Sequence, residues 1–397
     1  MDKSRIPASV VSALGLTQIV GYGTLYYSFS ILAPGMARDL GLSLAQVFGV
    51  FSVSLFIGGL SAIYIGRQMD RLGAATIMAA GSGLAALMLV LCAAAPSVAT
   101  FAIAIILLEV SSGMVQYQAA FATLVESDAH SAPRSITYLT LIGGFASTIF
   151  WPISSALASH LSWREIYLVF AALNLLICMP LHVWIRSLGK TARGLPVRPR
   201  TTVVGAVPPH RRQRTMLIVS VAFALLGFTL SAMLVHMVPL LGSIGLGAAA
   251  VVIGSLFGPA QVLSRLINMV FGKRLSPPGL AVLSAVLIVS GVAMLLLSRD
   301  WLPGAVAFAI CLGLGSGINS IAQGSLPLYL AGSEGYGAMT GKLTAARLAV
   351  GAVAPFAFAA AMEHLGLSFA LAANAALGAL SIAAFILVAR SCRAQAA

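Results

Sequence analysis

Charged residues are scarce in this chain: Asp, Glu, Lys and Arg make up 8% of its 397 residues, whereas soluble domains contain about 25%. Hydrophobic residues make up 59%, and the mean hydropathy is +1.00. A soluble fold cannot cover this much apolar surface, because much of its own surface must face water. The composition therefore predicts a membrane protein.

Motifs for metal binding and catalysis are also lacking. The cysteines are scattered without CxxC or Cys/His spacing, which excludes a disulfide framework and a metal site: they are Cys92, Cys178, Cys311 and Cys392. There is no HExxH or GxSxG. GYGAMTGKL has Leu343 where a phosphate loop needs Ser or Thr, and GLGLGSG lacks the acidic partner of a dinucleotide site. We predict no enzyme activity and no cofactor.

Long apolar segments are what the sequence does contain. A bilayer core needs about 20 apolar residues in a helix, because hydrocarbon leaves an open backbone without partners. Twelve segments qualify and predict an all-α polytopic fold: Val10–Leu32, Ala45–Ile65, Ala75–Ala95, Val98–Phe121, Ser135–Ala158, Glu165–Ile185, Met216–Leu241, Ala248–Phe271, Leu280–Leu297, Pro303–Leu326, Ala338–Ala361 and Leu367–Ala389.

The basic residues indicate the orientation of these helices. Of 23 Lys and Arg residues, 17 lie at the termini and in alternate loops, and the opposite loops hold only Arg38, Arg164 and Arg299. Positive loops stay in the cytoplasm. We therefore predict a multi-pass inner-membrane protein with both termini cytoplasmic. The net charge of +13 is mainly this topology signal, so nucleic acid is not an expected partner.

The chain divides into two similar halves. The polar stretch 187–214 is rich in Arg, Pro and Gly and predicts a cytoplasmic basic linker between bundles at 1–186 and 215–397. GRQMDRLG (Gly66–Gly73) and GKRLSPPG (Gly272–Gly279) lie at an offset of 206 residues. An internal duplication of a six-helix bundle is indicated, and in transporters the substrate lies near the midplane between such repeats.

GRQMDRLG resembles the GxxxDRxGR signature of the major facilitator superfamily, with Ala74 in place of the last Arg. The resemblance implies a fold of two pseudo-symmetric six-helix bundles and alternating access. It also implies that Gly66, Asp70, Arg71 and Gly73 form a cytoplasmic gate. The residue types agree, because Gly permits a tight turn and Asp accepts hydrogen bonds at a helix start. An ordinary polar turn is the alternative.

A narrower resemblance is to the bacterial branch related to monocarboxylate and oxalate:formate carriers. It is carried by GPAQVLSRL (Gly258–Leu266), GGFASTIFWPISSALASHLSWREIY and GYGAMTGKLTAARLAVGAVAP. Eukaryotic members of that group carry an Asp and, four residues later, an Arg in helix 8, both tied to proton and carboxylate binding. Here these places hold Gln261 and Arg265. The resemblance thus implies carboxylate binding. It does not carry over proton coupling by this pair, because Gln261 stands where the Asp is found.

Arg265 and Arg347 fall inside predicted helices. Arg265 lies seven residues before Gly272, about 10 Å inside its helix, and Arg347 ten residues after Gly337, about 15 Å. Charge at such depth is costly and persists where it faces water, a counterion or a ligand. Two guanidinium groups favour a carboxylate. The alternatives are snorkelling to the headgroups and a structural ion pair.

Other polar residues in the spans complete the candidate site. Tyr22, Tyr26 and Phe29 predict an aromatic wall at i, i+4 and i+7. Asn319 and Gln323 are further substrate-binding candidates, with hydrogen bonding between helices as the alternative. Glu109 is the single acid in the interior of a predicted span, and it either pairs with a buried Arg, carries a coupling proton or packs as a neutral group.

The sequence thus predicts a secondary transporter for a small solute, with an organic anion such as a monocarboxylate or dicarboxylate as the expected substrate. The expected partners are that anion, the lipid bilayer and a coupling proton. Two alternatives stay open: efflux of drugs or metalloids, and a membrane receptor or scaffold that does not transport.

Overall fold

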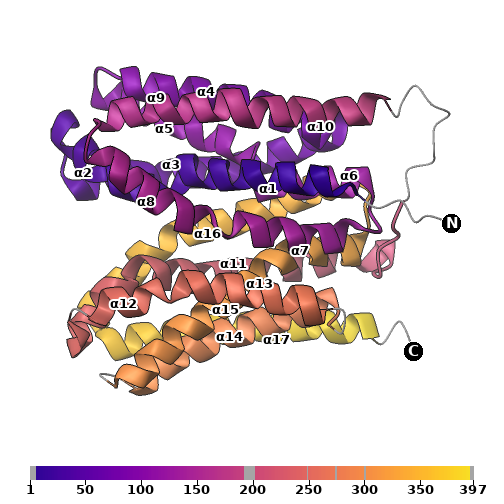
Figure 1. Cartoon of the computed structure of the whole chain (residues 1–397). Helices are drawn as coiled ribbons and strands as arrows, with labels where there is room; N and C mark the ends of the chain where they lie inside the picture. The colour runs from indigo at the N-terminus through magenta and orange to yellow at the C-terminus, as the bar shows by residue number, and fades with distance from the viewer. Residues whose placement is uncertain (1–5, 192–201, 248, 273–274, 299–300, 394–397) are drawn as a thin grey trace. The chain divides into compact units, whose positions relative to one another are not determined.

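The computed structural model describes residues 6–191, 202–247, 249–272, 275–298 and 301–393, and helices dominate these ranges (Figure 1). The chain forms two compact units. Unit 1 is Met1–Val204 with Ser333–Ala345, and unit 2 is Gly205–Gly332 with Ala346–Ala397. Helix α16 (Tyr336–Leu365) is shared, because its first turns belong to unit 1 and the remainder to unit 2.

Unit 1 contains six predicted spans, several of them made of two helices in series. Its elements before α16 are α1 (Ala8–Tyr22), the π-helical turn η1 (Gly23–Tyr27), α2 (Phe29–Leu40), α3 (Leu44–Leu72), α4 (Ala74–Ala94), α5 (Val98–Gly113), α6 (Tyr117–Ser127), α7 (Ala132–Gly143), α8 (Ala146–Ala158), α9 (Trp163–Leu173), the π-helical turn η2 (Asn174–Cys178) and α10 (Met179–Thr191).

The core of unit 1 is apolar, and local caps fix where its helices begin. Phe101, Tyr167 and Phe170 are among the largest fully buried side chains. Capping boxes start α3, α5 and α9, where the Ser side chain and the residue at the third helical position bond each other's backbone amides. Each box satisfies amides that have no partner inside the helix.

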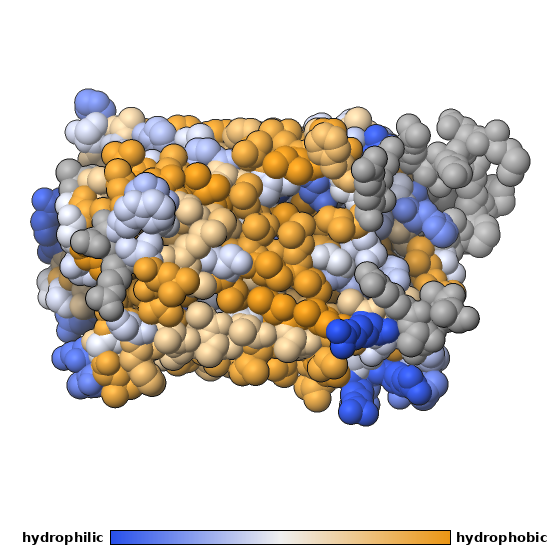
Figure 2. All heavy atoms as spheres, turned by 90° about the horizontal axis from the view of Figure 1, so that it is seen from below, coloured by the Kyte–Doolittle hydropathy of each residue, from blue (hydrophilic) through white to orange (hydrophobic). Residues whose placement is uncertain are grey.

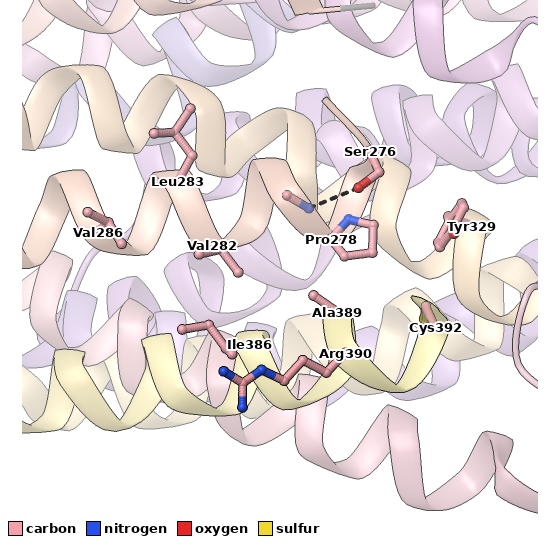
Figure 3. Close-up of a pocket in the computed structure, with 11 residues that line it drawn as sticks. Ser276, Pro278, Val282, Leu283, Val286, Tyr329, Ile386, Ala389, Arg390 and Cys392 are labelled. Atoms are coloured by element: carbon pink, nitrogen blue, oxygen red, sulfur yellow. Dashed lines mark hydrogen bonds between the residues drawn. The ribbon is translucent and has the colours of Figure 1, made fainter. Parts of the chain in front are cut away.

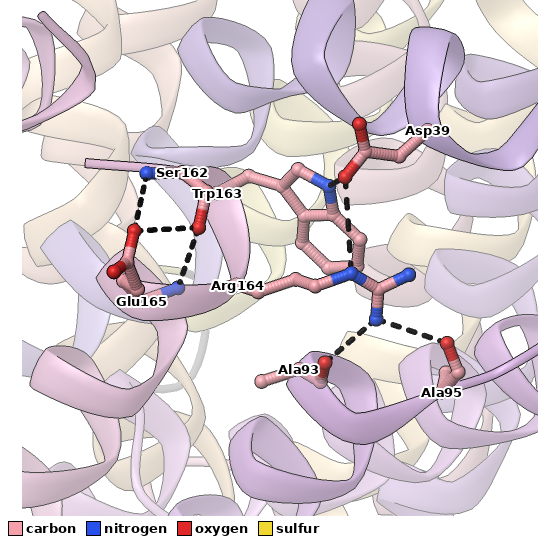
Figure 4. A network of polar contacts seen from close by, with 7 residues as sticks. All are labelled: Asp39, Ala93, Ala95, Ser162, Trp163, Arg164 and Glu165. Carbon is pink, nitrogen blue, oxygen red and sulfur yellow. Dashed lines mark hydrogen bonds and ion pairs between the residues drawn. The ribbon is translucent and has the colours of Figure 1, made fainter.

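A polar network ties together the ends of α2, α4 and α9 (Figure 4). Asp39 Oδ2 accepts a hydrogen bond from Trp163 Nε1 (2.8 Å) and lies 3.8 Å from Arg164 Nε. Arg164 Nη1 donates to the carbonyl oxygens of Ala93 (2.6 Å) and Ala95 (2.9 Å), at the end of α4. Arg164 was predicted in a loop. It serves instead in the first turn of α9, where it caps the carbonyl groups of a neighbouring helix.

Unit 2 contains the other six predicted spans. Its elements, besides the larger part of α16, are α11 (Pro209–Leu241), the short turn η4 (Gly242–Leu246), α12 (Ala249–Ser255), α13 (Phe257–Phe271), α14 (Pro277–Ser298), α15 (Leu302–Ala331) and α17 (Leu367–Arg393). Glycines allow close packing of α14 against α15: a Cβ at Gly315 would lie 2.6 Å from Ile288 and 2.8 Å from the Ser284 carbonyl.

Eleven helices in the described part are long and apolar enough to cross a membrane. The twelfth predicted segment, Ala248–Phe271, consists of α12 and α13, with residue 248 outside the described residues. Its break at Leu256 has a physical reason, because Pro259 provides no amide for the preceding turn. Figure 2 shows hydrophobic residues across the middle of one face and hydrophilic residues gathered at both ends, as expected for membrane helices.

Several helices extend further than predicted. The first span runs from Ala8 to Leu40, and the seventh starts at Pro209 rather than Met216. Helix α10 reaches Thr191, so both ends of the predicted linker are helical, while residues 192–201 lie outside the described part. The apolar pattern marks the bilayer-spanning portion only, whereas a helix continues until a cap or a proline stops it.

Pro355 interrupts the hydrogen bonds within α16, and a neighbouring helix supplies the donor that is missing. Pro355 in α16 has no amide, so the Gly351 carbonyl loses its partner within the helix. Ser231 of α11 donates a hydrogen bond to this carbonyl (2.9 Å), and His236 Nε2 lies 2.9 Å from the Pro355 carbonyl oxygen. In a bilayer, such bonds between helices replace the partners that water would provide.

Candidate functional site

Arg265 belongs to a pair of polar side-chain contacts between α13 and α15 of unit 2. Its side chain is 3% exposed. Arg265 Nε donates to Ser320 Oγ (3.2 Å), and one turn earlier Gln261 Nε2 donates to Ser316 Oγ (2.9 Å). Gly317 makes this proximity possible, because a Cβ there would collide with the Gln261 carbonyl. Two such contacts at i, i+4 spacing on both helices hold the guanidinium in one place.

One nitrogen of this guanidinium is unused. Nη1 of Arg265 is buried and has no hydrogen-bond partner among the described residues. Leaving a buried charged donor unpaired costs more than leaving a neutral one, so such a donor calls for a negatively charged or strongly polar partner. The described part of unit 2 contains a single acid, Glu363, which is exposed near the end of α16.

Asn319 and Gln323, also predicted as site residues, follow on α15. Asn319 is 4% exposed, and its Oδ1 has no partner among the described residues. Gln323 is half-buried. With Ser316 and Ser320, they recur every three to four residues, so α15 carries a row of polar side chains beside the Arg265 helix.

Arg347 occupies a different environment from Arg265. It is half-buried in α16 and its side chain passes over Gly227 of α11, where an added Cβ would lie 2.8 Å from Arg347 Cγ. The immediate neighbours described for the two arginines are therefore on different helices, α11 for Arg347 and α15 for Arg265. Glu363 lies 16 residues beyond Arg347 on the same helix, about 24 Å along its axis.

The predicted aromatic wall of unit 1 exists with a different register. Tyr22 contacts Tyr27 (ring centroids 6.2 Å apart) and Tyr117 of the α5–α6 break (4.8 Å). Phe29 is 2% exposed and joins the wall through Phe51 of α3, on which it stacks at 4.0 Å. The register differs because of η1, since a π-helical turn bonds i to i+5 and moves the next aromatic neighbour by one position.

The wall extends over three more spans. Tyr27 meets Trp151 of α8 edge to face at 5.9 Å, Tyr26 contacts Phe51 at 6.1 Å, and Tyr117 stacks on Phe121 at 5.3 Å. Trp151 is 49% exposed and Tyr26 41%. Tyr27, Tyr117 and Trp151 were not predicted. Their positions follow from the π turn and the helix breaks, which have no simple periodic signal.

Glu109 is buried in α5 of unit 1. It is 6% exposed, and its Oε1 has no hydrogen-bond partner among the described residues. Its Cβ and carbonyl face Gly58 of α3, where an added Cβ would lie 3.1 Å from Glu109 Cβ. The backbone and Cβ of Glu109 thus lie in a tight contact between two helices, and its buried carboxyl group has an oxygen able to accept a proton or a hydrogen bond.

The predicted gate residues lie at the end of α3, and Asp70 caps a distant helix. Asp70 Oδ1 accepts a hydrogen bond from the Gly337 amide (2.8 Å) and Oδ2 from the Ala338 amide (2.7 Å). Both amides belong to the first turn of α16, within unit 1. A carboxylate here satisfies orphan amides and the helix dipole together.

The other gate residues divide into packing and exposed positions. A Cβ at Gly66 would collide with the Gly337 carbonyl, and one at Gly341 with the Ala62 carbonyl, so α3 and the start of α16 touch backbone to backbone. Gly73 has φ +89°, a conformation that favours glycine, between α3 and α4. Arg71 is exposed.

Glu126 is a polar residue of this region that the sequence did not single out. Both of its carboxylate oxygens lie 3.0 Å from the Ala74 amide and accept a hydrogen bond from it. Glu126 of α6 therefore caps α4, which leaves Asp70 to cap α16. The sequence places Glu126 just after the predicted segment Val98–Phe121, which could have marked it as a capping residue, but it does not indicate which helix start it contacts.

A buried histidine was also missed. His182 of α10 is 1% exposed, and its ring nitrogens lie 2.8 Å from Ser82 Oγ of α4 and 3.0 Å from Thr17 Oγ1 of α1. Because both nitrogens have hydroxyl partners, His182 joins three helices. This is a structural arrangement rather than an open site.

Comparison with known proteins identifies the family. The model of the Major Facilitator Superfamily matches residues 14–355, which is most of the chain. The chain belongs to this superfamily. No curated protein matches it in sequence. The GRQMDRLG loop, with its Asp70 cap, therefore belongs to a superfamily transporter, as its resemblance to the signature indicated.

Solved structures of superfamily transporters share this fold. The human organic anion transporter MFSD10 is 15% identical, with 96% of this chain and 100% of that chain covered and a TM-score of 0.71. The proton:xylose symporter XylE is 13% identical, with 95% of both chains covered and a TM-score of 0.73. The E. coli fucose:proton symporter FucP is 13% identical, with 95% and 98% covered and a TM-score of 0.66.

These similarities confirm the predicted all-helical fold of two pseudo-symmetric six-helix bundles with twelve transmembrane helices. They concern the fold, because the identities are low. The narrower resemblance to monocarboxylate and oxalate:formate carriers stays a prediction, as do the linker boundaries, the inner-membrane location and the cytoplasmic termini.

Proposed function

We propose that this superfamily transporter moves a small organic anion, such as a monocarboxylate or dicarboxylate, across the inner membrane by alternating access. The superfamily membership makes it a transporter of small solutes. The anionic substrate is inferred from the residues of unit 2. One structurally similar protein is described as an organic anion transporter, which is compatible with this proposal but, at 15% identity, adds no residue-level support.

The observation that carries the proposal is the unused nitrogen of Arg265. The guanidinium is buried, fixed by Ser320 and without an acid nearby in the described part of unit 2. A permanent cation in this position is stabilised when a solute brings the negative charge. A carboxylate suits the planar donor group, because it accepts two parallel hydrogen bonds.

The surrounding amides fit the same class of solute. Gln261 and Asn319 provide polar groups close to Arg265 in sequence and on the adjoining helix. We propose that they orient the carboxylate and that Gln323 and Arg347 contribute further polar contacts. That Tyr22 and Tyr26 contact the apolar part of the same solute remains a prediction from the sequence.

Glu109 is our candidate for coupling. A buried carboxyl group with an unpartnered oxygen can take up a proton on one side of the membrane and release it on the other when its surroundings change. The proposal assigns proton coupling to unit 1, since the Asp expected four residues before Arg265 is Gln261.

The test is anion uptake into proteoliposomes by purified protein with Arg265→Gln, Arg265→Lys or Arg214→Gln. Arg214 is exposed near the start of α11 in the same unit and controls for removal of one positive charge. Arg265→Gln should lower carboxylate uptake at least about thirtyfold, the low end for removing one partner of a buried charge pair. Arg265→Lys should recover part of it, and Arg214→Gln should match the wild type.

The competing functions give different results in the same vesicles. Undiminished carboxylate uptake by Arg265→Gln would refute the assignment. Transport of cationic or neutral drugs that does not depend on Arg265 would favour efflux, a use that the exposed aromatic residues of unit 1 would suit. A lack of flux for every anion and drug would favour the receptor or scaffold.

A further inference from the structure

A cavity of about 400 Å³ lies between α14, α15 and α17 in unit 2, and none of the residues that line it takes part in the proposed transport site (Figure 3). One wall is apolar and is formed by Val282, Leu283 and Val286 of α14 with Ile386 of α17. Val282 and Val286 are one helical turn apart, so this wall runs along the helix axis. It offers an elongated apolar surface.

Among the described residues that line the same cavity, one side chain is basic. Arg390 lies on the last turns of α17, and Figure 3 shows its side chain running back along the helix toward Ile386. The exposed acid Glu363 cannot neutralise it, because α17 begins at Leu367 and Arg390 lies about 35 Å farther along its axis. The described part of unit 2 provides no other acid.

The cavity also lies where a span ends. Ser276 lines it just before α14 begins at Pro277, and Arg390 lines it three residues before α17 ends at Arg393. Val286 is nine residues into α14, about 13 Å deeper. The polar groups therefore lie at the ends of two apolar spans, where a membrane boundary is expected, and the apolar wall continues toward the middle of those spans.

We propose that this cavity binds an anionic phospholipid of the adjacent leaflet. The lipid phosphate pairs with the Arg390 guanidinium, the Ser276 hydroxyl lies at headgroup level, and the first part of one acyl chain covers Val282, Val286 and Ile386. Charge complementarity selects the anionic headgroup, and the depth of the apolar wall selects a lipid over a free phosphate. Basic pockets between membrane helices bind acidic lipids in this way.

Native mass spectrometry of the purified full-length protein tests this site. The protein is given equal amounts of phosphatidylglycerol and phosphatidylcholine with identical acyl chains. Wild type should retain phosphatidylglycerol with a preference of about fivefold, the effect of one Lys or Arg near anionic lipid. Arg390→Gln should abolish this preference, Arg390→Lys should keep part of it, and Arg214→Gln should leave it unchanged.

Two further arms separate lipid from phosphate. Val286→Phe fills the apolar wall and should lower retention of both lipids, whereas inorganic phosphate should not displace phosphatidylglycerol from wild type. The proposal is overturned if Arg390→Gln keeps the wild-type preference, if Arg214→Gln loses as much as Arg390→Gln, or if inorganic phosphate competes at the concentration of the lipid. None of these readouts depends on transport, so the lipid site is tested independently of the proposed function.

Discussion

Residues 66–73 in unit 1 and residues 272–279 in unit 2 occupy equivalent places in the duplicated sequence and cap helices in different ways. Asp70 accepts hydrogen bonds from amides 267 and 268 positions away, at the start of α16. The equivalent residue of the second loop is Ser276, whose hydroxyl accepts a bond from Gly279 three positions on, at 3.4 Å. The first loop caps a helix distant in sequence, whereas the contact described for the second loop caps the helix that follows it.

This difference indicates which loop can act as a gate. A bond between Asp70 and α16 can break and re-form when α16 moves, and α16 is the helix whose residues divide between the two units. A local cap such as Ser276 stays intact in any such movement. The buried charges are divided as well, because unit 1 holds the acid Glu109 and unit 2 the base Arg265. We therefore propose that coupling and gating belong to unit 1 and anion binding to unit 2.

The largest effect is expected at the buried acid. Glu109→Gln keeps the shape of the side chain and removes its exchangeable proton, so proton-driven accumulation of the anion should be abolished while exchange of anion for anion persists. Glu363→Gln, which removes the exposed acid of unit 2, should accumulate anion as the wild type does. Both are measured as anion uptake with and without an imposed pH gradient. Wild-type accumulation of the anion by Glu109→Gln would contradict the proposal that proton coupling lies in unit 1.

The next effect concerns the first glycine of each loop. A Cβ at Gly66 would collide with the backbone of Gly337, whereas the nearest described atoms to a Cβ at Gly272 belong to the flexible Asn268 side chain. Gly66→Ala should therefore lower the free energy of unfolding by about 3 kcal/mol, the upper end for overpacking, and Gly272→Ala by about 1 kcal/mol or less. Unfolding in mixed detergent micelles measures both. Equal losses would mean that the two loops pack alike.

A smaller effect is expected for the caps themselves. Asp70→Asn removes the charge that faces the start of α16 and should cost about 1 to 2 kcal/mol, while Ser276→Ala should cost about 0.5 kcal/mol because its bond is long and exposed. Hydrogen exchange gives a local readout. The Gly337 and Ala338 amides should exchange faster in Asp70→Asn and at the wild-type rate in Ser276→Ala; unchanged protection in Asp70→Asn would contradict the cap.

The smallest effect is expected at the proline of α16. Ser231→Ala leaves the Gly351 carbonyl without its donor from α11 and should lower the free energy of unfolding by about 0.6 kcal/mol, the average for a hydrogen bond between membrane helices. Thermal unfolding in detergent measures the loss. If Ser231→Ala loses more free energy of unfolding than Asp70→Asn, the proposal that the Asp70 cap in unit 1 stabilises more than the Ser231 bond in unit 2 is wrong.

The membrane spans were predictable from the sequence because their length is dictated by the bilayer. The predicted Ala75–Ala95 and the observed α4 (Ala74–Ala94) differ by one residue at each end. Ends set by caps were less predictable, as in α2, which continues to Leu40. The break between α12 and α13 was not predicted either, because an apolar pattern does not reveal where Pro259 interrupts the helical hydrogen bonds.

The site was predictable in its residue types and much less in its contacts. Buried charge is rare enough that Arg265 and Glu109 could be named from depth alone, and both are buried. Asp70 was expected to cap a helix start, but the sequence did not indicate that this helix is α16 or that Glu126 accepts from the Ala74 amide at the start of α4. The aromatic contacts pass through Tyr27 and Phe51, which the sequence did not indicate, because a π turn changes the spacing of side chains without a clear mark in the sequence.

The most direct test of an anion site at Arg265 is the thermal stability of purified wild-type and Arg265→Gln protein across a panel of small carboxylates, inorganic oxyanions and cationic drugs. A ligand that binds the folded state raises stability by mass action, by about 2.7 kcal/mol at one hundred times its dissociation constant. At least one carboxylate should stabilise wild type and Arg214→Gln and leave Arg265→Gln unchanged. Equal stabilisation of wild type and Arg265→Gln by the carboxylates would contradict the account.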